Sequence, residues 1–201
     1  MSGDRGLHLP RPRNGLRGLV GRPLALEVRA PFESRALKRS ELWDGEGIPP
    51  GKGRGALLIP GFMSGTTKAD ALAHVLRKAD WDVEVTQVGR NAGPAYHLPD
   101  AATEAVANLS ERTGEQVTII GHSRGGQIGR VLAVREPMRV RKVVAIGAPL
   151  RTKYPPFLLV KLPAEALDRV WRAGVLGPVD PDREQEVDDH RFVPFPEDVE
   201  L

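Results

Sequence analysis

The chain has 201 residues, 40% hydrophobic and 27% charged, which suits one domain with a single core. It contains no cysteine, which excludes disulfides, thiolate metal sites and a cysteine nucleophile. The net charge is +3, with basic residues in excess near the N-terminus. Without interleaved aromatic residues, this excess does not indicate specific nucleic-acid binding. No transmembrane segment or secretory signal is recognisable, and a cytoplasmic location is the simplest expectation.

Residues 1–23 are rich in Gly, Pro and Arg, and they are predicted to form a flexible basic arm. Residues 24–201 are predicted to form a single domain in which short apolar runs alternate with amphipathic segments. In chain order, we expect a helix at 32–42, a strand at 56–59, a helix at 67–79, a strand at 81–88, a helix at 99–112, a strand at 117–120, a helix at 125–135 and a strand at 142–146. This alternation predicts an α/β fold, with a mostly parallel sheet flanked by helices.

The regular alternation stops after Pro149. Residues 150–198 are predicted to be a lid-like or irregular segment that contains one helix at 163–173. At the end of the chain, residues 199–201 resemble the opening of another strand. The sheet is therefore expected to be incomplete at the C-terminus, with an exposed edge that a partner or an oligomer would cover.

The most informative segment is Gly-His-Ser-Arg-Gly-Gly at 121–126, directly after a predicted strand and before a predicted helix. In that setting Ser123 would occupy a sharp, strained turn that exposes its hydroxyl as a nucleophile. Gly121 and Gly125 would form the structural elbow, because larger side chains would collide with the turn. The alternative is a glycine-rich turn in which a buried Ser123 only caps the helix.

The segment from Ala56 to Leu150 resembles the lipase/esterase branch of the α/β-hydrolase superfamily, and it is similar to bacterial lipase-like and inositol-deacylase-like members. The sequences that carry the resemblance are Pro-Gly-Phe at 60–62, Gly-Arg-Asn-Ala-Gly-Pro at 89–94, Gly-His-Ser-Arg-Gly-Gly at 121–126 and Gly-Ala-Pro-Leu at 147–150. The resemblance implies hydrolysis of a carboxylic ester, from a small molecule or a lipid, through an acyl-enzyme. It implies neither a cofactor nor a metal.

The resemblance also implies an oxyanion hole made of two backbone amides, those of Phe62 and Arg124. The side chains of Phe62 and Met63 would form an apolar lip for an acyl chain, or else pack in the core. The segment 89–94 would lie near the mouth of the site, or else form a plain turn after a strand.

The base and the acid of a catalytic triad are harder to find. In the superfamily the order is Ser, then Asp or Glu, then His. After Ser123 the sequence holds one histidine, His190, beside Asp188 and Asp189. His190 as base and Asp189 as acid are one hypothesis; the alternative is a solvated loop histidine.

His190 precedes the strands that would carry the triad in this superfamily. A truncated gene product is the preferred explanation. A separate chain that supplies the missing residues and a protein that has lost catalysis but kept the fold are the other two. The functional hypotheses are therefore an esterase or lipase-like serine hydrolase, with acyl transfer as a variant, and a non-catalytic binding module.

Overall fold

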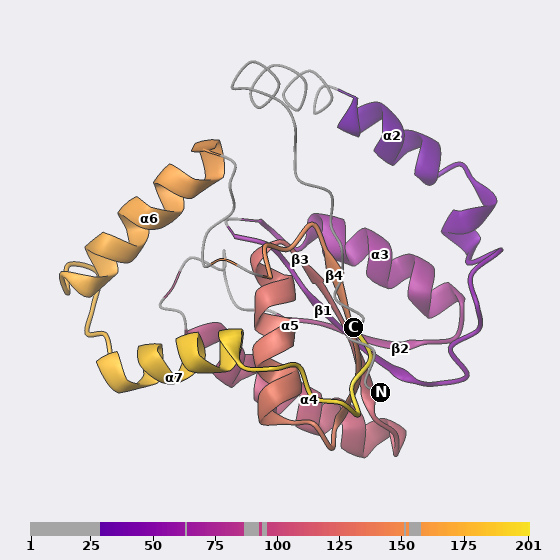
Figure 1. Ribbon diagram of the computed structural model, residues 1–201. Coiled ribbons are helices and arrows are strands. Elements are labelled where there is room, and N and C mark those ends of the chain that lie inside the picture. Colours follow the sequence, from indigo (N-terminus) through magenta and orange to yellow (C-terminus); the bar gives the residue numbers. More distant parts are fainter. Residues whose placement is uncertain (1–28, 63, 87–92, 94–95, 151, 153–157) are drawn as a thin grey trace, which may run out of the picture. The chain divides into compact units, whose positions relative to one another are not determined.

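The computed structural model describes residues 29–62, 64–86, 93, 96–150, 152 and 158–201 (Figure 1). Contacts divide the chain into two units, residues 1–39 and residues 40–201. The described part of the first unit contains helix α2 (Ala30–Leu37). The predicted arm at 1–23 and its boundary lie outside the described residues.

The second unit is built on a parallel sheet of four strands in the order β2-β1-β3-β4. Every neighbouring pair in this sheet runs parallel, which confirms the predicted fold class. The strands are β1 (Gly55–Ile59), β2 (Asp82–Val85), β3 (Val117–His122) and β4 (Val140–Ile146). All five residues of β1 are buried, as expected for a central strand with both faces covered.

Helices pack against both faces of the sheet. On one face, α3 (Thr67–Lys78) covers β1 and β2 through a cluster that includes Leu58, Leu76 and Val83. On the other face, α4 (His97–Thr113) and α5 (Arg124–Arg135) share the larger core, which contains Leu57, Ile119 and many other aliphatic side chains. The sheet therefore has one helical layer on each side.

The observed helices follow the predicted ones, with two differences. The predicted helix at 32–42 is not continuous: residues 32–37 belong to α2, and residues 41–42 belong to the short 3₁₀ helix η1 (Glu41–Asp44). The segment predicted to hold one helix contains two described helices, α6 (Leu158–Arg172) and α7 (Pro181–Phe192). None of the helices in the described ranges is long and apolar enough to span a bilayer.

The C-terminal residues lie alongside β4. Glu200 forms a parallel bridge with Lys142: the Val143 amide donates to the Glu200 carbonyl at 2.7 Å, and the Glu200 amide donates to the Arg141 carbonyl at 3.0 Å. Val199, next to it, is buried in the core beneath α4 and α5. The opening of another strand, predicted at 199–201, is thus observed as a single bridge.

Candidate active site

Ser123 lies at the sharp turn where β3 ends and α5 begins. Its backbone has φ 53° and ψ −118°, a region that residues with a side chain rarely adopt. Two hydrogen bonds hold it there: the Ser123 amide donates to the Ile146 carbonyl at 2.9 Å, and its carbonyl accepts from the Gly126 amide at 3.0 Å. Such strain costs about 1–3 kcal/mol and is typical of functional positions.

The Ser123 hydroxyl does not cap the helix. Although Ser123 occupies the N-cap position of α5, its side chain forms no capping hydrogen bond, and the residue is only half-buried. The alternative in which a buried serine merely caps α5 is therefore wrong.

The glycines around Ser123 are required by close backbone contacts. A Cβ atom at Gly121 would lie 2.3 Å from the carbonyl carbon of Gly125. A Cβ atom at Gly125 would lie 2.1 Å from the carbonyl oxygen of Ile59. Since heavy atoms cannot approach so closely, the turn can pass over β1 only with glycine at both positions.

The loop after β1 contacts the same turn. A Cβ atom at Gly61 would lie 2.9 Å from Nδ1 of His122 and 3.3 Å from Cβ of Ser123. Phe62 follows Gly61 directly, so its backbone amide belongs to the segment that touches the serine. The amide of Arg124, on the other side, is the first of helix α5. Met63 lies outside the described residues.

The side chain of Arg124 has a role that its position in the sequence did not indicate. Its Nη2 donates to the carbonyl oxygen of Gly93 at 3.1 Å, which ties the turn at Ser123 to a segment 31 residues earlier in the chain. Gly93 belongs to the segment 89–94 that was expected near the mouth of the site. Gly89, Arg90 and Asn91 lie outside the described residues.

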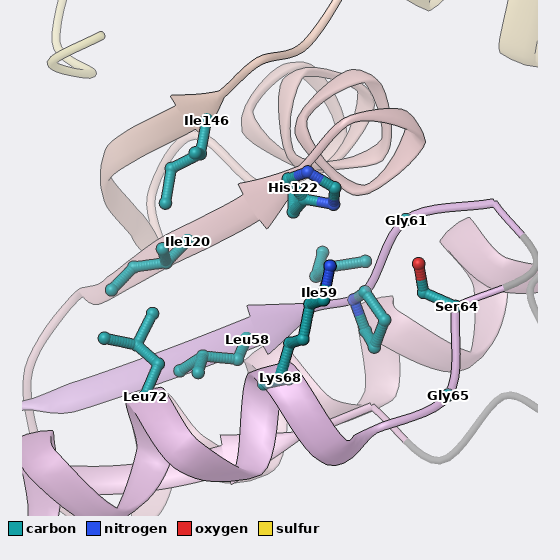
Figure 2. A pocket seen from close by; sticks show the side chains of 12 residues that line it. Leu58, Ile59, Gly61, Ser64, Gly65, Lys68, Leu72, Ile120, His122 and Ile146 are labelled. Atoms are coloured by element: carbon teal, nitrogen blue, oxygen red, sulfur yellow. The ribbon is translucent and has the colours of Figure 1, made fainter. Parts of the chain in front are cut away.

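A hollow of about 180 Å³ opens beside the turn, on the face of the sheet that α3 partly covers (Figure 2). Its walls are mostly apolar and come from β1, β3, β4, α3 and the loop between β1 and α3. The lining residues include Leu58, Gly61, Ser64, Lys68, Leu72, Ile120, His122 and Ile146. Sequence reasoning did not find this hollow, because its walls come from five elements that only the fold brings together.

His190 and Asp189 lie on α7, where their contacts are local. Nδ1 of His190 is 3.6 Å from Oε1 of Glu186, and Asp189 accepts a hydrogen bond from Gln185 at 2.7 Å. Asp188, the alternative acid, pairs with Arg191 on the same helix at 2.7 Å. His190 is therefore a helix residue rather than a loop residue.

Helix α7 packs against α5 at a distance from Ser123. Arg130 donates to the carbonyl oxygens of Arg191 and Val193, and burial lowers the pKa of its guanidinium. Arg135 pairs with Glu186 at 2.9 Å. Arg130 and Arg135 follow Ser123 by about 10 and 18 Å along the helix, at 1.5 Å per residue. The structure thus places His190 beside the second half of α5 and does not bring it to Ser123.

The other described histidines have different surroundings. His74 stacks on Trp43 with ring centroids 4.2 Å apart, and His97 packs edge-on against Tyr96 at 4.7 Å. Among the described residues, no histidine or carboxylate is hydrogen-bonded to the Ser123 hydroxyl. The same residues contain no cluster of three or more His, Asp or Glu side chains suited to a metal ion.

Three solved structures are similar to parts of this chain. A monoacylglycerol lipase from Paleococcus ferrophilus is 21% identical, with a TM-score of 0.42, and the match covers 75% of this chain and 62% of that one. A lipase-esterase related protein from Clostridium acetobutylicum is 21% identical, with a TM-score of 0.40 and coverages of 70% and 62%. A probable hydrolytic enzyme from Pseudomonas aeruginosa is 20% identical, with a TM-score of 0.35 and coverages of 72% and 53%.

This chain therefore spans less than two thirds of the length of each of these structures. A family model described as the α/β hydrolase fold matches residues 60–183, which is more than half of the chain. The match begins in the loop after β1 and includes Ser123 with its flanking glycines. On this match and the parallel sheet, the chain belongs to the α/β hydrolase fold family.

Proposed function

We propose that this protein is a serine hydrolase of carboxylic esters, with Ser123 as the nucleophile. The observation that carries the proposal is the conformation of Ser123. Its backbone is held at φ 53°, and its hydroxyl is not used to cap α5. A fold retains such strain where the surrounding structure enforces it, and this is common at reactive positions.

In the proposed reaction, the Ser123 oxygen attacks the ester carbonyl carbon while its proton passes to a general base. The negative oxygen of the tetrahedral intermediate accepts hydrogen bonds from the amides of Phe62 and Arg124. The carbon–oxygen bond to the alcohol then breaks, and the alcohol leaves with the proton. Water hydrolyses the ester on Ser123, which releases the acid and restores the hydroxyl. One such amide donor is worth about 10²–10³ in kcat.

His190 and Asp189 are not the base and acid of this proposed reaction. Their contacts are with α7 and with the second half of α5. A base must come within hydrogen-bond reach of the hydroxyl, directly or through one water molecule. We propose that the base belongs to a segment other than α7.

A fluorophosphonate probe tests the nucleophile, because it forms a covalent bond with an activated serine. We expect one equivalent of label on Ser123, and none in Ser123→Ala. Ser64→Ala is the matched control, since Ser64 lies nearby in the loop after β1, and it should label like the wild type. His190→Ala should also label normally. Fluorophosphonate label on Ser123→Ala would contradict the proposal. A folded wild-type protein that takes up no label would contradict it as well.

The second candidate is a binding module that keeps the fold without catalysis. It is favoured by the lack of a histidine or carboxylate hydrogen-bonded to the Ser123 hydroxyl among the described residues. It predicts no fluorophosphonate label, no turnover of activated esters such as p-nitrophenyl butyrate, and an effect of Ser123→Ala on stability alone. Acyl transfer is a variant of the first candidate, and the release of an ester in place of an acid would identify it.

A further inference from the structure

Gln127 has an unusual place in the helix that begins at the nucleophile. Helix α5 lies wholly within the described ranges, and Gln127, 4% exposed, is the only polar residue among its buried residues. The others are glycines or aliphatic residues. Burial of a side-chain amide costs free energy unless the amide is hydrogen-bonded, and an aliphatic side chain of similar size would avoid that cost. We therefore looked for the partners of the Gln127 amide.

The Gln127 side chain is bonded to the segment that follows β4. Its Nε2 donates to the carbonyl oxygen of Pro149 at 2.9 Å and to that of Thr152 at 2.7 Å. We call residues 147–150 and 152 the post-β4 segment. None of these residues belongs to a helix or a strand, so no regular backbone hydrogen bonding fixes their position. The two bonds from Gln127 attach the segment to α5.

The post-β4 segment lies beside the turn at Ser123. Strands β3 and β4 are parallel neighbours that end at the same edge of the sheet, and the Ser123 amide donates to the carbonyl oxygen of Ile146 at 2.9 Å. A Cβ atom at Gly126 would lie 2.5 Å from Cβ of Ala148. Ligands of open α/β sheets bind outside the carboxyl ends of the strands. This position makes the segment a candidate wall of the ester site.

Arg124 attaches a second segment to the same turn of α5. Its Nη2 donates to the carbonyl oxygen of Gly93, which lies between β2 and α4 and outside both. Arg124 and Gln127 are three residues apart, and each donates to backbone carbonyls in a different connection of the sheet. The first turn of α5 therefore carries the nucleophile and also holds segments that follow β2 and β4.

We propose that Gln127 is a positioning residue of the ester site. By holding the post-β4 segment beside Ser123, it keeps one wall of the site in place before a ligand binds. This inference rests on the proposed hydrolase function. A site that is correctly formed for only part of the time binds its ligand more weakly in proportion, whereas the reaction of the bound ligand is unchanged. The role of Gln127 therefore concerns binding and not the chemical step.

Gln127→Leu tests the proposal, because leucine fills a similar volume and removes both donors. The rate of fluorophosphonate labelling, measured over a range of probe concentrations, gives a dissociation constant KI and a maximal rate kinact. We expect KI to rise up to about tenfold, through the loss of two hydrogen bonds, and kinact to change by less than about twofold. The order parameters of the Leu150 and Thr152 amides, from ¹⁵N relaxation, should fall below about 0.6.

Ile128→Val is the matched control. Ile128 follows Gln127 and is also 4% exposed, but its side chain belongs to the core that α5 shares with α4. The substitution removes one buried methyl group and leaves both hydrogen bonds of Gln127 in place. It should lower the stability of the fold without changing KI or the order parameters of the post-β4 segment.

The possible failures of this test are distinct. Order parameters that stay high in Gln127→Leu would overturn the proposal, because the segment would not depend on Gln127. Low order parameters with an unchanged KI would overturn it too, since the segment would then be no part of the site. In both cases normal labelling of the wild type would leave the hydrolase function standing. A folded wild type that takes up no label would refute that function, and the role of Gln127 with it.

Discussion

At the scale of single residues, the backbone of Ser123 gives the most direct prediction. Alanine at this position would keep the strained backbone, with φ 53° and ψ −118°, whereas glycine adopts positive φ without steric cost. Ser123→Gly should therefore have a free energy of unfolding about 1 kcal/mol higher than that of Ser123→Ala, as measured in urea. A less stable glycine variant would mean that residue 123 has an ordinary conformation in solution.

The glycines of α5 make a second prediction at the same scale. Gly125→Ala places a methyl group 2.1 Å from the carbonyl oxygen of Ile59, so the backbone of β1 must move. We expect a loss of about 3 kcal/mol or more in the free energy of unfolding. Gly129→Ala is the control in the same helix, because its nearest neighbours are side-chain atoms, 3.0 Å away on Ile119 and 3.1 Å away on Val143.

The higher helix propensity of alanine offsets part of the steric cost of these contacts with Ile119 and Val143. Gly129→Ala should therefore change the free energy of unfolding by less than about 1 kcal/mol. Urea unfolding of both variants measures the difference. Equal effects at the two positions would contradict the close passage of α5 over β1.

At the scale of elements, an ion pair connects β2 to α4. Nε of Arg112 lies 2.7 Å from Oδ2 of Asp82, and this hydrogen bond holds the pKa of Asp82 below its ordinary value. A depressed carboxyl pKa stabilises the fold at neutral pH, and this contribution is lost as the pH falls through the folded pKa, below about 4. Because both side chains are about a third or more exposed, we expect Asp82→Asn to cost only about 0.5 kcal/mol at pH 7.

The difference between the wild type and Asp82→Asn should shrink as the pH falls below about 4 and disappear below the folded pKa of Asp82, where the carboxyl group is protonated in both the folded and unfolded states. Urea titrations at a series of pH values from 7 downward measure it. Glu84→Gln is the control, since Glu84 lies farther from Arg112, at 3.6 Å. A difference that does not shrink as the pH falls would assign the effect to packing and not to charge.

The elements also show what the sequence could predict. The four strands and helices α3, α4 and α5 were predictable because each is a short apolar run or has its own apolar period. Helix α7 was missed because it is strongly polar, and of its hydrophobic residues only Val187 is buried. Its start does carry a local helix signal: Asp180 accepts hydrogen bonds from two amides of the first turn, and Pro181 follows it.

The candidate site likewise has one part that the sequence could predict and another part that it could not. The elbow at Ser123 was predictable because one continuous motif defines it, together with the glycines on either side. The contact between Arg124 and Gly93 and the hollow lined by Lys68 were not predictable. They depend on residues that only the folded sheet brings together.

At the scale of the whole described chain, Val199 and Glu200 connect residues 199–201 to the core and to β4. Val199 is buried with residues of β1, α4 and α5, and Glu200 forms two backbone hydrogen bonds to β4. Full burial of a valine side chain contributes about 1.5–3 kcal/mol. We therefore expect removal of residues 199–201 to lower the free energy of unfolding by about 2–3 kcal/mol, as measured in urea.

Amide hydrogen exchange locates this effect within the sheet. The Val143 amide should be protected in the full chain, because it donates to the Glu200 carbonyl at 2.7 Å, and it should lose protection when residues 199–201 are removed. Removal of Leu201 alone is the control: its side chain is 54% exposed, so stability should change by less than about 0.5 kcal/mol. Equal protection of Val143 in both shortened chains would mean that β4 does not depend on Glu200, and that burial of Val199 alone connects the C-terminus to the core.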